Sequence, residues 1–141
     1  MQPYLKPLPV KAPENMPFWD GLDRGEFRVP KCNDCGDWNW IPYPACRSCL
    51  SDNLTWTPVS GKATLFSFTI VYRGLGAFNA EVPYVIALAE LPEKPRSIVV
   101  QGNLVGIDPE QVKIGMPLKI VYETIECEDV TLWRFMPDDA A

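Results

Sequence analysis

The 141-residue chain is predicted to be mainly β, with a short helix near its N-terminus, and three observations predict this fold class. Strand-like runs rich in β-branched and aromatic residues fill the second half of the chain, and turn residues separate them. Four cysteines in two Cys-x2-Cys pairs occupy a middle segment with little regular periodicity. A short helical pattern precedes that segment and follows a proline-rich start.

The N-terminal part, residues 1–27, is predicted to form an extended arm and a docking helix. Five prolines near its start favour extended backbone, because proline fixes φ and has no N–H to donate. Phe18, Trp19 and Leu22 then fall on one face of a helix that Gly25 is suited to end. A helix this short is marginal on its own, so we expect its aromatic face to pack on another surface.

The C-terminal part, residues 59–141, is predicted to form a small barrel. Its five strand-like runs are dense in Val, Ile, Thr, Tyr and Phe. They cover Ala63–Tyr72, Tyr84–Leu91, Ser97–Leu104, Leu118–Glu123 and Val130–Phe135. A capped single helical turn at Asp108–Val112 follows the third run. Five short strands with one helical turn after the third predict a Greek-key barrel of the OB type.

The middle part, residues 28–58, is predicted to form a rubredoxin-like zinc ribbon. Each Cys-x2-Cys loop can present two thiolates to one ion, and two loops complete a tetrahedron. The four predicted ligands are Cys32, Cys35, Cys46 and Cys49. We expect one structural Zn²⁺, because four thiolates leave no open coordination position for water or substrate. Iron is the minor alternative, since tetrahedral sulfur suits both metals.

Composition and charge disfavour several classes of protein. The net charge of −5 and the pI of about 4.7 disfavour nucleic-acid binding, which relies on clustered Lys and Arg. No apolar run reaches the roughly 18 residues that a membrane-spanning helix needs. The start of the sequence has no signal-peptide apolar stretch, so we expect a cytoplasmic protein with reduced cysteines. The alternative of two disulfides is further disfavoured because Cys127 is left over.

The sequence contains no histidine. The side chain best suited to proton transfer near neutral pH is therefore missing, and a His-based triad or dyad within this chain is excluded. We predict no catalytic residue in the chain and expect any chemistry to reside on a partner.

Two pairs of aromatic residues are candidates for a partner interface. Trp38 and Trp40 lie two apart between the cysteine pairs and would share one face of an extended segment. They could form a small core over the metal loops, or an exposed anchor. A ribbon this small has little interior, and aromatics are enriched at binding hot spots. We therefore predict an interface built from Phe18, Trp19, Trp38 and Trp40.

Four basic residues near the ribbon stand out in an acidic chain: Arg24, Arg28, Lys31 and Arg47. A solvated surface is the usual role of such residues. The alternative is a contact with the phosphates of a nucleotide-bearing ligand such as coenzyme A.

A series of short motifs runs from Pro17 to Pro137. They are Pro17–Leu22, Lys31–Gly36, Ala45–Cys49, Trp56 with Ser60 and Gly61, Val82–Leu88, Gly102–Gly106 and Ile114–Leu118. In this order they resemble the acyl-CoA-associated family of OB-fold proteins with a rubredoxin-like zinc ribbon.

The resemblance implies a helix, a zinc ribbon and an OB barrel in that order. It also implies a small accessory subunit of a thiolase-type enzyme, in a hetero-oligomer whose thiolase-like subunit carries the catalytic Cys and His. The small subunit would support assembly and shape a channel for a coenzyme A thioester at the shared interface, in benzylsuccinate-type aromatic degradation or in other acyl-CoA degradation. The alternatives are a stand-alone acyl-CoA-binding protein and a nucleic-acid-binding ribbon and OB module.

Overall fold

Two sheets and one α-helix organise the chain in the computed structural model, which describes residues 4–139. Helix α1 spans Met16–Asp23, and strands β1, Arg28–Cys32, and β2, Leu54–Pro58, form the ribbon sheet. The barrel strands are β3 (Lys62–Val71), β4 (Tyr84–Glu90), β5 (Val99–Leu104), β6 (Pro117–Ile125) and β7 (Val130–Pro137). Short 3-10 turns are η1 (Pro13–Asn15), η2 (Gly76–Glu81), η3 (Pro109–Gln111) and η4 (Glu126–Glu128).

The second sheet closes into a five-stranded barrel in the order β3-β4-β5-β7-β6, with β6 pairing back to β3. All pairs are antiparallel except β5 with β7, which meet in parallel where Leu104 opposes Phe135. Turn η3 follows the third barrel strand, and the Asp108 carboxylate caps it by accepting from the Glu110 amide at 3.0 Å. The OB-type barrel predicted from the sequence is therefore confirmed.

The barrel interior follows the two-residue period of its strands. Along β4, Val85, Ala87 and Ala89 are buried while the residues between them are half-exposed. This alternation places one side of each strand toward the core and the other toward solvent. Phe135 of β7 fills the interior beside these small residues and is fully buried.

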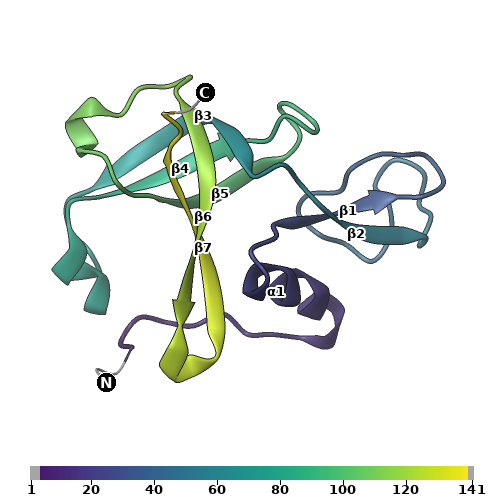
Figure 1. Ribbon diagram of the computed structural model, residues 1–141, viewed down its shortest axis with the longest axis horizontal. Helices are drawn as coiled ribbons and strands as arrows, with labels where there is room; N and C mark the ends of the chain where they lie inside the picture. Colours follow the sequence, from purple (N-terminus) through teal and green to yellow (C-terminus); the bar gives the residue numbers. More distant parts are fainter. Residues whose placement is uncertain (1–3, 140–141) are drawn as a thin grey trace.

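Helix α1 lies between the ribbon and the β6–β7 hairpin (Figure 1). Its apolar face, with Phe18, Trp19 and Leu22, is buried against both. Gly25 ends the helix with a φ of +73°, a left-handed conformation that glycine adopts without strain. The predicted helix is confirmed, and the surface it needs is supplied by this chain.

An ion pair also connects the ribbon to the barrel. The Lys94 ammonium, in the turn between β4 and β5, forms an ion pair with the Asp37 carboxylate of the ribbon. The Lys94 ammonium is the largest cause that lowers the pKa of Asp37, and a hydrogen bond from Ser48 adds to it. The ribbon is therefore fixed to one end of the barrel by a contact besides apolar packing.

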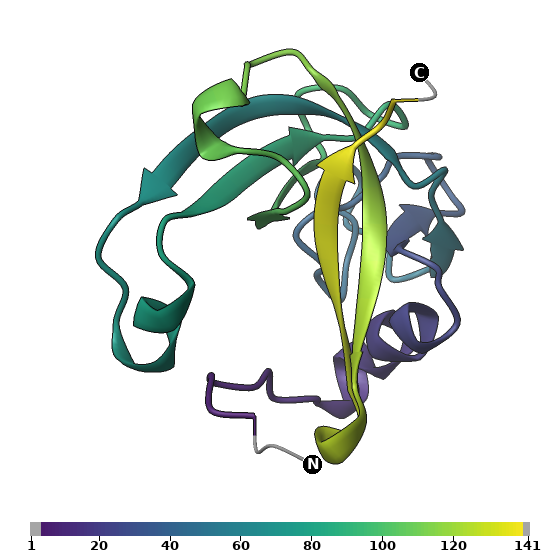
Figure 2. The ribbon, with the colours of Figure 1, turned by 60° about the vertical axis from the view of Figure 1, so that its left-hand side comes forward.

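The proline-rich arm runs from the β3–β4 connection to the β6–β7 hairpin (Figure 2). Lys6 binds the Glu81 carboxylate at 2.9 Å, and Lys11 donates to the carbonyl of Asp129 at 2.8 Å. Residues 4–12 of the arm form no helix or strand, and these two lysines attach them to loops far away in the sequence. Within residues 4–139, no helix is long and apolar enough to cross a membrane.

Gly102 allows the barrel wall to close, because an added Cβ would lie 2.8 Å from the Phe135 ring and 3.0 Å from Trp133 Nε1. We predict that Gly102→Ala lowers the free energy of unfolding by about 1–3 kcal/mol, since both rings would have to move. Urea denaturation measures this change. The control is Gln101→Ala, whose side chain is exposed and should matter by less than about 0.5 kcal/mol. Equal stability of the two variants would show that the rings move freely.

Candidate metal centre and aromatic pocket

The four predicted ligands form one cluster. The sulfurs of Cys32, Cys35, Cys46 and Cys49 all lie within 4.8 Å of one another. The closest pairs are Cys32 with Cys49, at 3.6 Å, and Cys35 with Cys46, at 3.5 Å. A zinc ion with Zn–S bonds of about 2.3 Å holds tetrahedral sulfurs about 3.8 Å apart. The cluster therefore has the dimensions of a tetrahedral metal site.

The two cysteine loops have the same backbone design. In the first loop, the Gly36 amide donates to the Cys32 carbonyl at 2.9 Å, and in the second the Leu50 amide donates to the Cys46 carbonyl at 2.8 Å. Both closing residues have positive φ, +78° at Gly36 and +65° at Leu50. Each turn aims amides at sulfur, such as the Ser48 amide at 3.4 Å from Cys46 Sγ. Amide donors of this kind stabilise thiolates.

Asn39 braces the second loop from inside the ribbon. Asn39 is only 2% exposed, and its Oδ1 accepts a hydrogen bond from the Arg47 amide at 2.9 Å. A hydrogen bond from Asn39 is the largest cause that lowers the pKa of the Cys46 thiol to about 6. For Cys35, the Asp37 amide lowers the pKa, but lost solvation and the neighbouring thiols raise it to about 12.

The pKa of Cys46 is lowered and the pKa of Cys35 is raised within one group of four neighbouring sulfurs. Four sulfurs this close cannot all carry negative charge unless a cation neutralises them, because like charges disfavour ionisation. A thiophilic divalent metal supplies that charge and fills its coordination sphere with the four thiolates. The donor set therefore fits a structural metal ion, and it leaves no ligand position for substrate.

A second feature lies beside the metal centre and is made of aromatic rings. Phe18 of α1 is its hub, with its ring centroid 5.2 to 6.3 Å from five others. These belong to Trp19, Phe27, Trp40, Trp56 and Trp133. The contacts with Trp19, Phe27 and Trp133 are edge to face, a geometry that adds about 0.5–1.5 kcal/mol per pair beyond burial. The cluster therefore joins the helix, the ribbon and the barrel.

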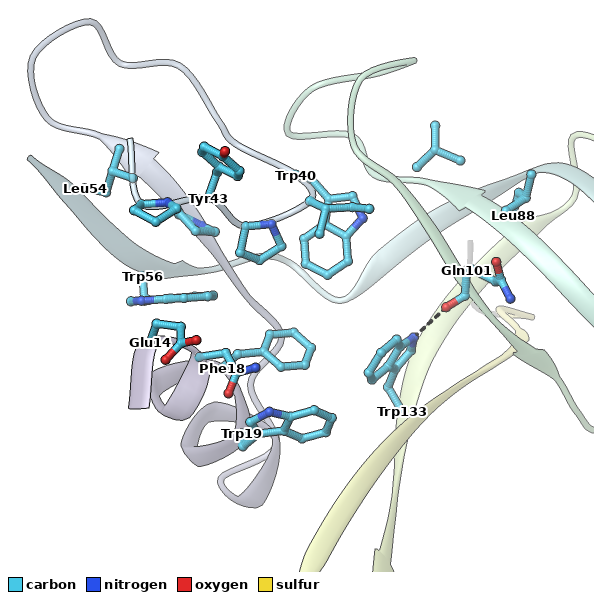
Figure 3. Close-up of a pocket in the computed structure, with 16 residues that line it drawn as sticks. Glu14, Phe18, Trp19, Trp40, Tyr43, Leu54, Trp56, Leu88, Gln101 and Trp133 are labelled. Carbon is cyan, nitrogen blue, oxygen red and sulfur yellow. Dashed lines mark hydrogen bonds between the residues drawn. The ribbon is translucent and has the colours of Figure 1, made fainter. Parts of the chain in front are cut away.

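A cavity of about 650 Å³ opens next to this cluster (Figure 3). Its walls come from η1 and α1, from β1 and β2, from the ribbon segment 40–44, and from strands β4, β5 and β7 of the barrel. The residues that line it are Glu14, Asn15, Phe18, Trp19, Pro30, Trp40, Ile41, Pro42, Tyr43, Pro44, Leu54, Trp56, Leu88, Val99, Gln101 and Trp133. We call this cavity the aromatic pocket.

The structure places the four predicted interface residues in two groups. Phe18, Trp19 and Trp40 line the aromatic pocket, and the first two are only 6% and 8% exposed. Trp38 lies outside the pocket, half-buried, with the Lys31 ammonium 5.1 Å from its ring centre. Both of the predicted tryptophans of the ribbon thus pack on the core of this chain. Their contact with a partner stays a prediction.

Sequence reasoning did not place Trp133, Asn39 or Tyr43 at the site. Trp133 lies about a hundred residues from the helix that it contacts, so no local pattern could join them. Asn39 is a short polar residue between two tryptophans, and a residue of this type is typical of an exposed loop. Tyr43 lies between Pro42 and Pro44. Because proline fixes φ, these two prolines are the local signal that this segment has a restricted backbone.

Two of the basic residues near the ribbon are occupied by contacts within the chain. Arg28 pairs with the Glu26 carboxylate at 2.9 Å and donates to the Pro17 carbonyl at 3.0 Å. Arg47 donates to the carbonyls of Trp40 and Ile41, both at 3.3 Å. These guanidinium groups hold the backbone around the aromatic pocket.

The fold and the site define a metal-binding ribbon joined to an OB barrel, and comparison with known families agrees. Residues 19–55 match the family described as ChsH2, rubredoxin-like zinc ribbon domain. Residues 56–123 match ChsH2, C-terminal OB-fold domain. The chain therefore belongs to the ChsH2 zinc-ribbon and OB-fold family.

Similar proteins include enzyme subunits and scaffolds. The chain is 37% identical over 122 residues to the 3-oxo-4,17-pregnadiene-20-carboxyl-CoA hydratase alpha subunit of Mycobacterium tuberculosis, covering 86% of this chain and 37% of that protein. It is 30% identical over 135 residues to a probable enoyl-CoA hydratase alpha subunit of Thermomonospora curvata, covering 94% and 40%. The chain thus spans about two fifths of the length of these relatives. A DUF35 domain-containing scaffold protein of Methanocaldococcus jannaschii is 30% identical over 97 residues, covering 68% and 67%.

Solved structures show the same architecture. A chain described as Ltp2-ChsH2(DUF35) aldolase superposes with a TM-score of 0.82 and 26% identity, covering 92% of this chain and 98% of that one. A DUF35-family protein of unknown function from Sulfolobus solfataricus has a TM-score of 0.61 at 21% identity, covering 90% and 87%, which shows the fold alone.

We predict that Cys35→Ser abolishes metal binding and unfolds the ribbon, because three thiolates cannot close the coordination sphere of so small a unit. Elemental analysis of the purified chain measures the metal, with about one zinc expected per wild-type chain. Cys127→Ser is the matched control, since Cys127 is exposed and outside the cluster, and it should keep its metal. Full metal content in Cys35→Ser would refute the assignment, and iron in place of zinc would select the rubredoxin-like alternative.

Proposed function

We propose that this chain is a small zinc-binding accessory subunit of a thiolase-type acyl-CoA enzyme. It would assemble with a thiolase-like catalytic subunit, support the complex, and shape the channel for the coenzyme A thioester. The observation that carries the proposal is an exposed, apolar and well-held ribbon segment beside the aromatic pocket. We call residues 40–44 the ribbon loop.

The ribbon loop has the character of a protein-binding surface. Ile41 and Tyr43 are 65% and 64% exposed, and prolines flank Tyr43 on both sides. Exposed apolar groups that cluster in this way mark interaction sites. Arg47 binds the carbonyls of Trp40 and Ile41, so the loop is held in shape before any partner arrives. A preformed loop loses less conformational entropy on binding.

The metal would serve this surface and take no part in chemistry. Its four thiolate ligands would hold both ends of the segment that contains the ribbon loop, between Cys35 and Cys46. Trp38 and Trp40 lie in the same segment, and Phe18 and Trp19 pack behind it. These four residues are the proposed support of the partner interface. Zinc is the proposed metal, because it favours closed tetrahedral thiolate sites.

The absence of histidine from this chain supports a catalytic partner, since a thiolase-type reaction needs groups that activate a thiol and move protons. Relatives named as alpha subunits of CoA hydratases, and a related aldolase, support an acyl-CoA substrate. The ring-lined pocket favours an aromatic substrate, and we propose benzylsuccinate-type degradation, with cleavage of benzoylsuccinyl-CoA, as the setting. This finer proposal rests on the sequence resemblance together with the pocket.

We predict that the chain co-elutes from size-exclusion chromatography with a thiolase-like protein encoded beside it, after co-expression. The double variant Ile41→Glu, Tyr43→Glu should weaken this association at least roughly tenfold, because two charges would be buried without partners. Leu75→Glu is the control, since Leu75 is 87% exposed on the β3–β4 connection, and it should assemble normally.

The outcomes separate the alternatives. If no thiolase-like protein co-elutes with the wild-type chain, the subunit proposal fails. Tight binding of a coenzyme A thioester by the pure chain, without a partner, would instead favour a stand-alone acyl-CoA-binding protein.

A further inference from the structure

The aromatic pocket has the size and preformed shape of a small-molecule site. Its volume of about 650 Å³ lies within the roughly 300–1,000 Å³ that is typical of ligand pockets. In Figure 3, Tyr43 and Trp40 lie above Phe18 and Trp19, and the rings of Trp56 and Trp133 lie to the left and right of Phe18. A space walled by ring faces and edges on two sides favours a flat, apolar guest.

The walls are held in place by contacts made without a ligand. The Trp133 indole donates to the Gln101 carbonyl at 3.0 Å. Trp40 packs against Phe18 and Phe27, with ring centroids 6.0 and 5.4 Å apart. Tyr43 belongs to the ribbon loop, whose backbone Arg47 binds. A guest could therefore enter with little reorganisation of the protein.

Charge further restricts the guest. Glu14 is the one side chain that carries a full charge at neutral pH among the described residues that line the pocket, and it is exposed at the edge. Arg28, close to α1, is already paired with Glu26, and Arg47 is bound to backbone carbonyls. An anion in the pocket would therefore lose hydration without gaining a cation, and Glu14 would repel it. Phosphates and carboxylates are excluded on these grounds.

We infer that the aromatic pocket binds an uncharged, planar aryl group. Within the proposed function, on which this assignment of the natural ligand rests, that group is the aryl end of the acyl chain, and the carboxylate of that chain and the phosphates of the coenzyme lie outside the pocket. Polar groups at the pocket wall are available to a neutral carbonyl of the guest, among them the side chains of Asn15 and Gln101 and the indole N–H of Trp19, which has no hydrogen-bond partner.

The test uses the full-length, metal-loaded chain and the aryl ketone acetophenone. Indole N–H signals in ¹H–¹⁵N spectra report each tryptophan separately. We expect saturable shifts for Trp40, Trp56 and Trp133, which line the pocket, and none for Trp38, which does not. Benzoate, of similar shape but charged, should bind at least roughly tenfold more weakly, because its desolvated charge is unpaired.

Two tyrosines provide matched variants that should both fold, because each is well exposed. Tyr43→Ala removes one wall of the pocket and should raise the Kd for acetophenone roughly two- to tenfold. Tyr72→Ala, at a residue 68% exposed outside the pocket, should leave the Kd unchanged. Equal shifts at Trp38, equal affinity for benzoate, or an unchanged Kd in Tyr43→Ala would each overturn the inference.

This result is independent of the assembly experiment. If a thiolase-like subunit co-elutes but acetophenone does not bind, the pocket assignment alone fails. If acetophenone binds as described but no partner co-elutes, the aryl site stands and the accessory-subunit proposal fails.

Discussion

The packing of Phe18 against five other rings is the interaction on which the rest of this structure depends. Neither the eight-residue helix nor the ribbon has enough apolar surface to be stable alone. Each contributes aromatic faces to a shared core that also includes Trp133 of the barrel. Because the hub residue belongs to the helix, the helix orients the ribbon against the barrel and thereby sets the width of the pocket between them.

The metal centre and the ring cluster stabilise different parts of the ribbon. The sulfur cluster fixes the part of the ribbon that lies away from the barrel, where side chains such as Cys35 and Cys49 are exposed and little apolar area is buried. The ring cluster fixes the part of the ribbon next to α1, where Trp40 and Trp56 contact Phe18. Metal ligation suits a segment that lacks an interior, because coordination supplies folding free energy without buried surface.

Much of the fold follows from local patterns in the sequence. The two-residue period of β4 and the β-branched runs around it predict strands, and the cysteine spacing predicts the four ligands. The pocket could not be predicted in this way. Its walls join Glu14 to Trp133, and only the closed barrel and the docked helix bring such distant residues together. The sequence also could not show that the ribbon and the barrel of this chain cover most of Phe18 and Trp19, because those contacts join segments far apart in the sequence.

The aromatic pocket also bears on how the chain is divided. The helix, the ribbon and the barrel differ in local structure, yet each contributes walls to the pocket: Phe18, Trp40 and Trp133 come from these three parts in turn. A site shared in this way is lost if any one part shifts, because its shape is defined between them. The ion pair of Lys94 with Asp37 and the Phe18 hub hold the ribbon at two separate points. Two attachments restrict rotation of the ribbon about either one, so the ribbon keeps one orientation relative to the barrel at the pocket.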